Sequence, residues 1–320
     1  MLGRILVTPR SLTKAGLRAV PELRPLEEAG FELIATPAGM TPSDEDLASA
    51  LPGVRGWLAG VEPITRATLE HADGLEVISR NGTGVDNIDA QAAADRGIRI
   101  TRAAGANAQG VAELALAAAL SCARSLSWSS DSVKRGSWDR WQGREIADLR
   151  VGVVGLGAIG ATVAGLFRSL GASVVGHDPF TDLDGLDNLP LEELFARSNT
   201  VSLHAPPPTD GRALVDERLL SLMPAGSTLV NTARSALVDD AAVLAALESG
   251  RLGGYAVDAY DTEPPAPSAL LRHPRVLATP HLGGYTGASV SRATSMAVDN
   301  LLAHLAPARV PIRHDSGSLP

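Results

Sequence analysis

Short apolar runs alternate with amphipathic stretches along most of this 320-residue chain. Apolar runs bounded by polar turns are typical of strands buried on both faces of a parallel sheet. The candidate strands of the first hundred residues are Ile5–Thr8, Phe31–Ala35, Gly56–Ala59, Leu75–Ser79 and Gly97–Ile100. The stretches between them have helical character: Lys14–Gly30, interrupted by Pro21 and Pro25, then Ser43–Leu51, Arg66–Ala72 and Asp89–Arg96. Ser43, with Asp46 three residues later, has the pattern of a helix start.

The second half of the chain repeats this alternation. An Ala-rich stretch predicts one long helix over Asn107–Trp128, and the polar segment 131–148 has no strong period. Further strands are expected near Val151–Val154, Ser173–His177, Thr200–His204, Ser227–Asn231, Tyr255–Asp258 and Val276–Thr279. Helices are expected over Ala161–Leu170, Glu217–Leu222, Asp240–Ser249 and Ala288–Leu305, and the tail 307–320 is expected to be loosely ordered.

Repeated strand–helix units predict an α/β fold with two doubly wound parallel-sheet domains. The last helix follows the second set of strands and carries no dinucleotide motif, so we expect it to return to the first domain. The first domain is then discontinuous, covering 1–103 and 288–320, and the second covers 104–287. We expect the first to be flavodoxin-like and the second to be a Rossmann domain.

The stretch 151–160, Val-Gly-Val-Val-Gly-Leu-Gly-Ala-Ile-Gly, carries the clearest chemical signal. Gly155 permits a tight turn, Gly157 lets a pyrophosphate approach the backbone, and Gly160 lets helix and strand pack closely. The helix that follows offers free N–H groups and the positive end of its dipole to phosphates. Asp178, at the end of the next strand, would accept hydrogen bonds from ribose hydroxyls and repel a 2′-phosphate. This order of elements predicts binding of NAD rather than NADP.

Composition narrows the function classes. The net charge of -8 argues against a basic face for nucleic acid. The one cysteine, Cys122, allows no internal disulfide and lies in an Ala- and Leu-rich stretch, where it is expected to be core filler. No apolar run reaches membrane-spanning length. We therefore expect a cytoplasmic protein with a small-molecule substrate, no nucleic-acid or membrane partner and no metal site.

Three polar residues stand at predicted strand ends of the second domain. Arg234 lies in Asn231-Thr-Ala-Arg-Ser235, Glu263 in Asp261-Thr-Glu-Pro-Pro265, and His281 in Thr279-Pro-His-Leu-Gly-Gly284. A histidine can exchange a hydroxyl proton near neutral pH, and a neighbouring carboxylate stabilises its protonated form. An arginine can hold a carboxylate through two parallel hydrogen bonds. Beside a nicotinamide, these three groups would suffice to interconvert a 2-hydroxy acid and its 2-keto acid.

These motifs together resemble the D-isomer-specific 2-hydroxy acid dehydrogenase family over nearly the whole chain. The matching stretches are 79–89, the glycine motif, 198–206, Asn231-Thr-Ala-Arg, 258–265 and Pro280-His-Leu-Gly. The resemblance implies that Arg234 binds the substrate carboxylate and carbonyl, and that Glu263 pairs with the acid/base His281. It implies substrate contacts at Asn81, Gly82, Arg234 and His281. Cofactor contacts are expected at Thr83, Gly155, Gly157, Ala158, Ile159, Gly160, Asp178, His204, Ala205, Pro206, Thr232, Ala233, Arg234, Asp258, His281 and Gly283.

Within the family, Asn81-Gly-Thr-Gly84 and His281-Leu-Gly-Gly-Tyr-Thr286 are similar to the 3-phosphoglycerate dehydrogenases. Those enzymes place a phosphate-binding arginine after the third strand, where this chain has Ala59. The expected substrate is therefore a small anionic D-2-hydroxy acid, either 3-phosphoglycerate-like or a related acid. Residues that could supply the missing charge are Arg10, Arg80, Arg140 and Arg144.

Other interpretations stay open at this stage. Each of Arg234, Glu263 and His281 taken alone is more often structural than catalytic. Some relatives of this fold are NAD-sensing corepressors, which would bind NAD without turnover. A formate or phosphite oxidiser could share the scaffold, although the formate enzymes have glutamine where this chain has Glu263. The family habit also predicts a homodimer formed through residues 107–148, with Trp138 and Trp141 in packing or interface positions.

Overall fold

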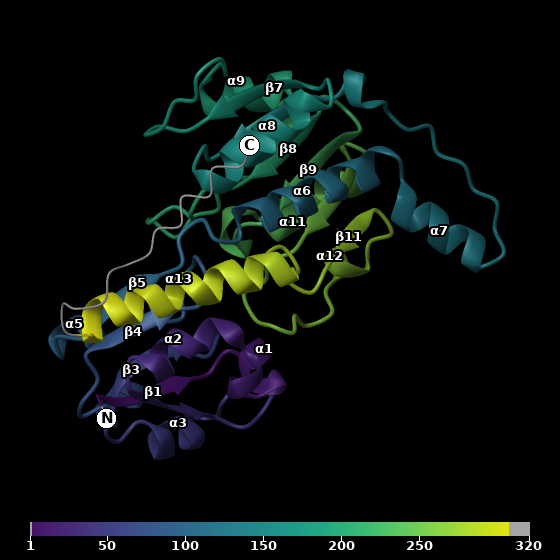
Figure 1. Ribbon diagram of the computed structural model, residues 1–320. Helices are drawn as coiled ribbons and strands as arrows, with labels where there is room; N and C mark the ends of the chain where they lie inside the picture. Colours follow the sequence, from purple (N-terminus) through teal and green to yellow (C-terminus); the bar gives the residue numbers. More distant parts are fainter. Residues whose placement is uncertain (1, 307–320) are drawn as a thin grey trace, which may run out of the picture. The chain divides into compact units, whose positions relative to one another are not determined.

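The computed structural model describes residues 2–306, and these residues form two compact units (Figure 1). The first unit contains residues 2–107 and 287–306, and the second contains Ala108–Thr286. The expectation for the tail 307–320 lies outside the described residues. Both units are built on fully parallel sheets with helices on both faces, which confirms the predicted fold class.

The first unit has a five-stranded sheet with the order β2-β1-β3-β4-β5. This is the order of the flavodoxin-like doubly wound fold, whose topological switch point lies between β1 and β3. The five predicted strands are present, with ends shifted by up to two residues. Their bounds are β1 Gly3–Val7, β2 Phe31–Ala35, β3 Val54–Ala59, β4 Val77–Arg80 and β5 Arg99–Arg102.

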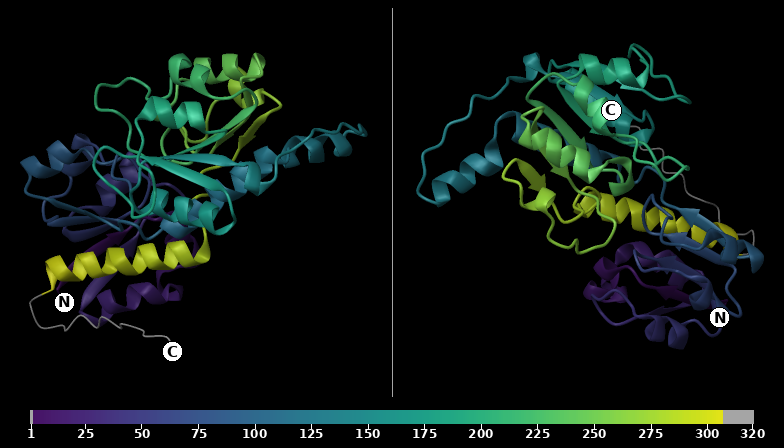
Figure 2. Two further views of the ribbon diagram at one scale, coloured as in Figure 1. Left: turned by 90° about the horizontal axis from the view of Figure 1, so that it is seen from above. Right: turned by 180° about the vertical axis from the view of Figure 1, so that it is seen from behind.

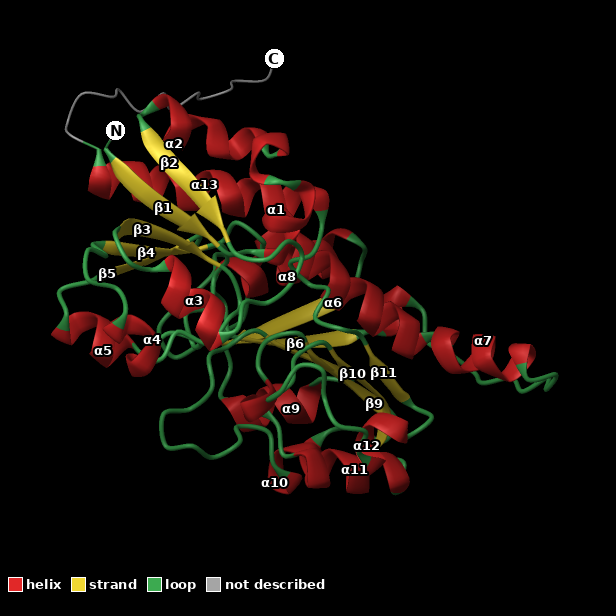
Figure 3. Ribbon diagram, turned by 90° about the horizontal axis from the view of Figure 1, so that it is seen from below, coloured by secondary structure: helices red, strands yellow, loops and turns green. Residues whose placement is uncertain are grey.

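Alternate residues of each central strand pack against opposite helical layers, because successive side chains of a strand point to opposite faces. On one face, Ile5, Leu58 and Val77 pack with α2 (Arg24–Glu28) and α13 (Gly287–Leu305). On the other face, Leu6, Trp57 and Ile78 pack with side chains of three other helices. Those helices are α3 Asp44–Ala50, α4 Arg66–Glu70 and α5 Ala90–Asp95 (Figure 3).

Local sequence signals decide where the helices of this unit begin. Ser43 caps α3 as predicted: its hydroxyl accepts from the Asp46 amide at 3.2 Å, and the Asp46 carboxylate accepts from the Ser43 amide at 2.9 Å. The helical stretch expected over Lys14–Gly30, with interruptions at Pro21 and Pro25, consists of several short elements. The chain forms α1 (Arg10–Ala15), two short 3₁₀ turns over Leu17–Ala19 and Pro21–Leu23, and then α2. Proline lacks the amide that a continuous helix needs, so each helical segment stays short.

The second unit has a six-stranded sheet with the order β11-β10-β9-β8-β6-β7. Its strands are β6 Arg150–Val154, β7 Ser173–His177, β8 Thr200–Leu203, β9 Ser227–Asn231, β10 Leu252–Val257 and β11 Val276–Ala278. α6 (Ala108–Ala123) and α8 (Ala158–Ser169) cover one face. The other face is covered by α9 Leu191–Arg197, α10 Glu217–Leu222, α11 Asp240–Glu248 and α12 Ala269–Arg272 (Figure 2). Sequence pattern alone did not predict α9 or α12, which are short.

The predicted long helix over Asn107–Trp128 is also wrong, because the helix breaks. α6 ends at Ala123, Ser125 adopts a left-handed conformation with φ 55°, and α7 spans Leu126–Lys134. The Ser125 amide bonds to the Cys122 carbonyl at 3.1 Å, so the last turn of α6 tightens. Cys122 itself is buried, as predicted for core filler. The ribbon diagrams in Figures 1, 2 and 3 show α7 and the chain after it extending away from the sheet of this unit.

A helix that crosses a membrane must be both long and apolar. None of the described helices alone has both the length and the apolar composition that a crossing needs. Only α6 and α7 taken together reach them, and these two helices are bent by 59° where they meet.

Candidate active site

The glycine turn of the second unit joins β6 to α8 and has little room for side chains. Gly155 has φ +89°, and a Cβ there would lie 2.6 Å from the Ala205 amide nitrogen. A Cβ at Gly160 would overlap the Gly155 carbonyl oxygen, whereas one at Gly157 would meet nothing within 4 Å. Two of the glycines therefore let the chain pack on itself, and Gly157 leaves open space at the start of α8. Ala158 and Ile159 are the first residues of that helix, where amides lack intrahelical acceptors.

Asp178 stands directly after β7 and is tied to the glycine turn. Its Oδ2 accepts a hydrogen bond from the Leu156 amide at 2.8 Å. Its Oδ1 accepts from the amides of Phe180 at 2.8 Å and Thr181 at 3.1 Å. A carboxylate has about four acceptor positions, so Oδ2 keeps one for a ribose hydroxyl. Asp178 therefore fixes the glycine turn and can still accept a hydrogen bond from a ribose hydroxyl, as predicted.

Two buried polar atoms near these strand ends have no hydrogen-bond partner among the described residues. They are Nδ1 of His204 and Oγ1 of Thr232. The other ring nitrogen of His204 lies 2.8 Å from the Ser202 hydroxyl, and burial lowers the pKa of this histidine to about 3. An unpaired buried polar atom is costly, so both atoms mark places where a ligand could complete the site. Ala205 and Pro206 continue from His204 along the same edge of the sheet.

The segment after β9 presents Arg234 in extended backbone, with φ −139° and ψ 140°. The Asn231 side chain holds this segment through two hydrogen bonds. Its side-chain oxygen accepts from the Ala233 amide at 3.1 Å, and its side-chain nitrogen donates to the Arg234 carbonyl at 2.8 Å. One Arg234 guanidinium nitrogen donates to the Ala233 carbonyl at 2.8 Å. The buried Asn231 thus fixes the backbone from which the arginine projects.

His281 and Glu263 are brought together although they lie 18 residues apart. Nδ1 of His281 is 2.6 Å from Oε1 of Glu263. Because the Glu263 carboxylate accepts a hydrogen bond from Nδ1–H, the other ring nitrogen, Nε2, stays available. Both side chains are about half exposed, so a reactant could reach them. The pair predicted from sequence is present.

Asp258 holds the turn that carries His281. Its Oδ1 accepts from the Thr279 hydroxyl at 2.6 Å and the Leu282 amide at 2.7 Å, and its Oδ2 accepts from the Gly283 amide at 2.8 Å. His281 has φ 53°, a left-handed conformation that is costly for a residue with a side chain. The three hydrogen bonds that the buried Asp258 carboxylate accepts offset that cost. The motifs indicated a cofactor contact at Asp258 but gave no sign of this structural role.

The loop that carries Glu263 has two further anchors that the sequence did not indicate. The Tyr260 hydroxyl donates to the Thr279 carbonyl at 2.8 Å, and the Ser235 hydroxyl donates to Asp261 Oδ1 at 2.5 Å. The first anchor joins the loop to the His281 turn, and the second joins it to the residue after Arg234. Such pairs follow no periodic pattern, so the sequence carried no signal for them.

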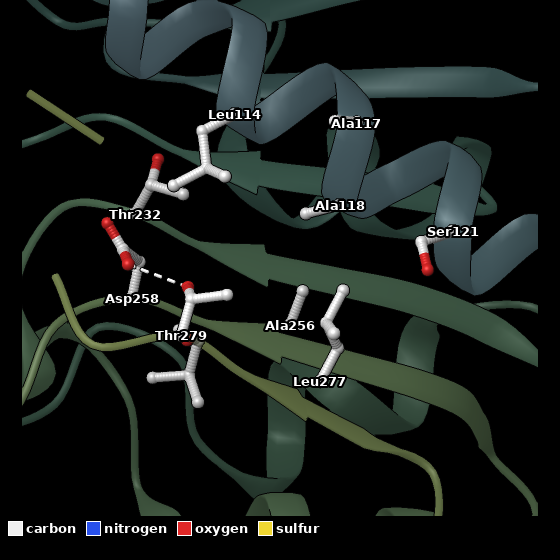
Figure 4. Close-up of a pocket in the computed structure, with 10 residues that line it drawn as sticks. Leu114, Ala117, Ala118, Ser121, Thr232, Ala256, Asp258, Leu277 and Thr279 are labelled. Carbon is white, nitrogen blue, oxygen red and sulfur yellow. Dashed lines mark hydrogen bonds between the residues drawn. The ribbon is translucent and has the colours of Figure 1, made fainter. Parts of the chain in front are cut away.

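A cavity of about 200 Å³ lies between α6 and the carboxyl ends of β10 and β11 (Figure 4). Leu114 and Ala118 of α6 and Leu277 of β11 form much of its apolar lining. Thr232 and Asp258 stand at one end of it. The unpaired Thr232 hydroxyl therefore lies beside a space large enough for part of a ligand.

The remaining predicted residues lie in the first unit, in the loop after β4. The Asn81 amide donates to the Ala59 carbonyl at 2.8 Å, which ties this loop to the end of β3. The Thr83 hydroxyl donates to the Asn107 side chain at 2.8 Å. Asn81, Gly82 and Thr83 thus follow the carboxyl end of β4, the edge where ligands of doubly wound sheets bind.

Comparison with known proteins identifies the family. Residues 116–283 match the model described as D-isomer specific 2-hydroxyacid dehydrogenase, NAD binding domain. The chain belongs to the D-isomer specific 2-hydroxyacid dehydrogenase family. This finding confirms the resemblance seen in the motifs, and it places the glycine turn, Asp178, Arg234, Glu263 and His281 inside the NAD-binding domain of the family.

The chain is also similar to individual proteins over most of its length. The chain is 36% identical over 231 residues to a D-3-phosphoglycerate dehydrogenase of Methanocaldococcus jannaschii, covering 70% of this chain and 44% of that protein. The TT0316 protein of Thermus thermophilus matches with a TM-score of 0.84 and 34% identity, covering 94% of this chain and 96% of that one. TP0037 of Treponema pallidum, a D-lactate dehydrogenase, matches with a TM-score of 0.79 and 27% identity, covering 95% of this chain and 98% of that one. The chain spans about half the length of the curated relatives it matches.

Proposed function

We propose that this protein is an NAD-dependent dehydrogenase that interconverts a D-2-hydroxy acid and its 2-keto acid. The observation that carries the proposal is the 2.6 Å hydrogen bond between His281 and Glu263, built on the same sheet edge as Arg234 and the dinucleotide turn. An acid/base pair, a carboxylate-binding arginine and a dinucleotide site are the parts this reaction needs. Membership of the family supports the same assignment.

The residues of the second unit fit NAD. The open space at Gly157 and the amides of Ala158 and Ile159 suit a pyrophosphate, and Oδ2 of Asp178 suits a ribose hydroxyl. The unpaired hydroxyl of Thr232, beside the apolar cavity, suits the amide of a nicotinamide. Bound NAD would accept or supply the hydride.

The chain's own residues supply binding and proton transfer. Arg234 holds the substrate carboxylate and polarises the carbonyl to be reduced. Nε2 of His281 gives a proton to the carbonyl oxygen in reduction and takes it back in oxidation. Glu263 keeps the ring oriented through Nδ1 and stabilises its protonated form. Asp258 maintains the strained turn from which His281 acts.

We also propose a homodimeric, cytoplasmic protein. Four apolar side chains stand exposed along α7 and the chain after it: Leu126, Val133, Trp138 and Trp141. Trp138 is 81% exposed, which is unusual for so large an aromatic side chain unless a partner covers it. A second copy of this chain is the partner that family habit suggests. Cytoplasmic location is supported by the single, buried cysteine.

The test is a panel of 2-keto acids with NADH, followed by loss of nicotinamide absorbance. We expect turnover with at least one member, and we expect His281→Asn to lose about 10²–10⁴-fold in kcat while keeping NADH affinity. His304→Asn, an exposed histidine of α13, serves as the matched control and should behave like the parent. NADH binding without turnover of any keto acid would favour an NAD-sensing corepressor instead. Full activity in His281→Asn would remove the proposed acid/base.

A further inference from the structure

The two members of the acid/base pair stand on separate backbone segments of the second unit. Glu263 lies in the loop after β10, and His281 lies in the turn after β11. Their 2.6 Å hydrogen bond therefore requires the loop and the turn to keep a fixed spacing. Because both side chains are about half exposed, burial alone does not fix their positions. Some other contact has to hold the loop against the turn.

A tyrosine hydroxyl makes such a contact. The Tyr260 hydroxyl donates to the Thr279 carbonyl at 2.8 Å, and the His281 amide donates to the same carbonyl oxygen at 2.9 Å. Tyr260 lies three residues before Glu263, and Thr279 lies two residues before His281. One carbonyl oxygen thus accepts a hydrogen bond from the loop that carries Glu263 and from the residue that acts as the acid/base.

The surroundings of Tyr260 keep its hydroxyl in place as a donor. The partly buried ring packs against the apolar core on the face of the sheet that α9, α10, α11 and α12 cover. Burial, together with the negative charges of Asp258 and Glu263, raises the pKa of the Tyr260 hydroxyl. The hydroxyl therefore keeps its proton at neutral pH and can donate it to a carbonyl oxygen.

The other bonds in this region hold the turn and the loop to different partners. The Asp258 carboxylate ties the His281 turn to the end of β10, through Thr279, Leu282 and Gly283. The Ser235 hydroxyl ties Asp261 of the loop to the segment after Arg234. Neither bond joins the loop to the turn as the Tyr260 hydroxyl does. Both would remain if that hydroxyl were removed, so the fold of this region does not depend on it.

We propose that Tyr260 is a positioning residue for proton transfer, whose hydroxyl holds the Glu263 loop against the His281 turn. The proposal rests on the proposed function, in which Nε2 of His281 exchanges the proton. A proton donor must stay within hydrogen-bond reach of the reacting oxygen, and a small misplacement slows the reaction. Tyr260 touches neither substrate nor cofactor in this role, because it acts through the orientation of the pair.

The experiment begins with Tyr260→Phe, which removes one oxygen atom and retains the packed ring. We expect kcat for keto-acid reduction to fall on the order of ten-fold, as the loss of one hydrogen bond allows. KM and the NADH affinity measured by fluorescence should stay near the parent values, because Arg234 and the dinucleotide turn are unchanged. Ser221→Ala is the matched control: in α10 it removes a hydroxyl that donates to the Arg218 carbonyl at 2.7 Å, and kcat should not change.

A second variant distinguishes positioning from a general structural effect. Glu263→Ala removes the carboxylate that Tyr260 is proposed to hold, so adding Tyr260→Phe to it should cost less than Tyr260→Phe costs alone. A parental kcat in Tyr260→Phe, or losses that simply multiply in the double variant, would overturn the positioning role. Retained NADH affinity shows that each variant is folded. Absence of turnover with every keto acid in the parent would instead contradict the proposed function, and the role of Tyr260 would fall with it.

Discussion

Two glycines in the same helix should respond to the same substitution in opposite directions. Gly160 and Gly165 both lie in α8. A Cβ at Gly160 would overlap the Gly155 carbonyl oxygen and lie 2.9 Å from its carbon and 3.3 Å from Val153 Cγ1. A Cβ at Gly165 would meet nothing within 4 Å. Comparing the two alanine variants therefore distinguishes two effects. One is the intrinsic helix preference of alanine, and the other is the close packing of the dinucleotide turn.

The expected magnitudes follow from these contacts. Gly165→Ala should stabilise the protein by about 1 kcal/mol, because alanine restricts the unfolded chain and favours a helix. Gly160→Ala should cost about 3 kcal/mol, the upper end for overpacking, since the obstacle is backbone that a rotamer change cannot move. Gly155 has φ +89° and packs on Ala205, so the turn has little freedom to retreat. A difference of about 4 kcal/mol should separate the two melting temperatures by roughly 8 °C.

The assay is a thermal melt of the parent and both variants, together with NADH titration by fluorescence. Gly160→Ala should melt below the parent and bind NADH at least about ten-fold more weakly, because the turn that receives the pyrophosphate is displaced. Gly165→Ala should melt at or above the parent and bind normally. Equal melting temperatures and affinities for the two variants would refute the view that Gly160 is required by its contact with Gly155.

Three further predictions concern the cofactor, pH and assembly. Asp178→Ala should reduce the ratio of kcat/KM with NADH to kcat/KM with NADPH, because it removes a hydrogen-bond acceptor for the ribose and a charge that repels a 2′-phosphate. An unchanged ratio would count against this role of Asp178. Burial lowers the pKa of His204 from 6.5 to about 3, so the unfolded state binds the extra proton between these values and stability falls as pH drops through that window. His204→Asn should therefore lose less melting temperature than the parent between neutral and acid pH, and parallel curves would contradict the linkage. Light scattering should show a dimer at micromolar concentration that Trp138→Ala weakens, whereas a monomeric parent would exclude the proposed interface.

The sequence by itself determined the strand alternation and the glycine turn. Buried parallel strands are continuous apolar runs, so their positions can be read along the chain. The turn needs glycine for local reasons, namely a positive φ at Gly155 and close packing at Gly160. Arg234 and His281 were recognisable because each sits in a short motif that follows a strand.

The tertiary structure decided what depends on residues far apart in the chain. The break of the long Ala-rich helix at Ser125 has no glycine or proline to announce it. Asp258 turns out to hold the His281 turn, through hydrogen bonds to residues 21 to 25 positions away. Glu62 is an ordinary loop acid in the sequence and is buried in the structure, where its side chain bonds to Thr8, 54 residues earlier. Residues close together in the sequence fix the local backbone conformation. The order of strands in each sheet brings distant strand ends together, and this order decides which side chains are buried and which hydrogen-bond partners they find.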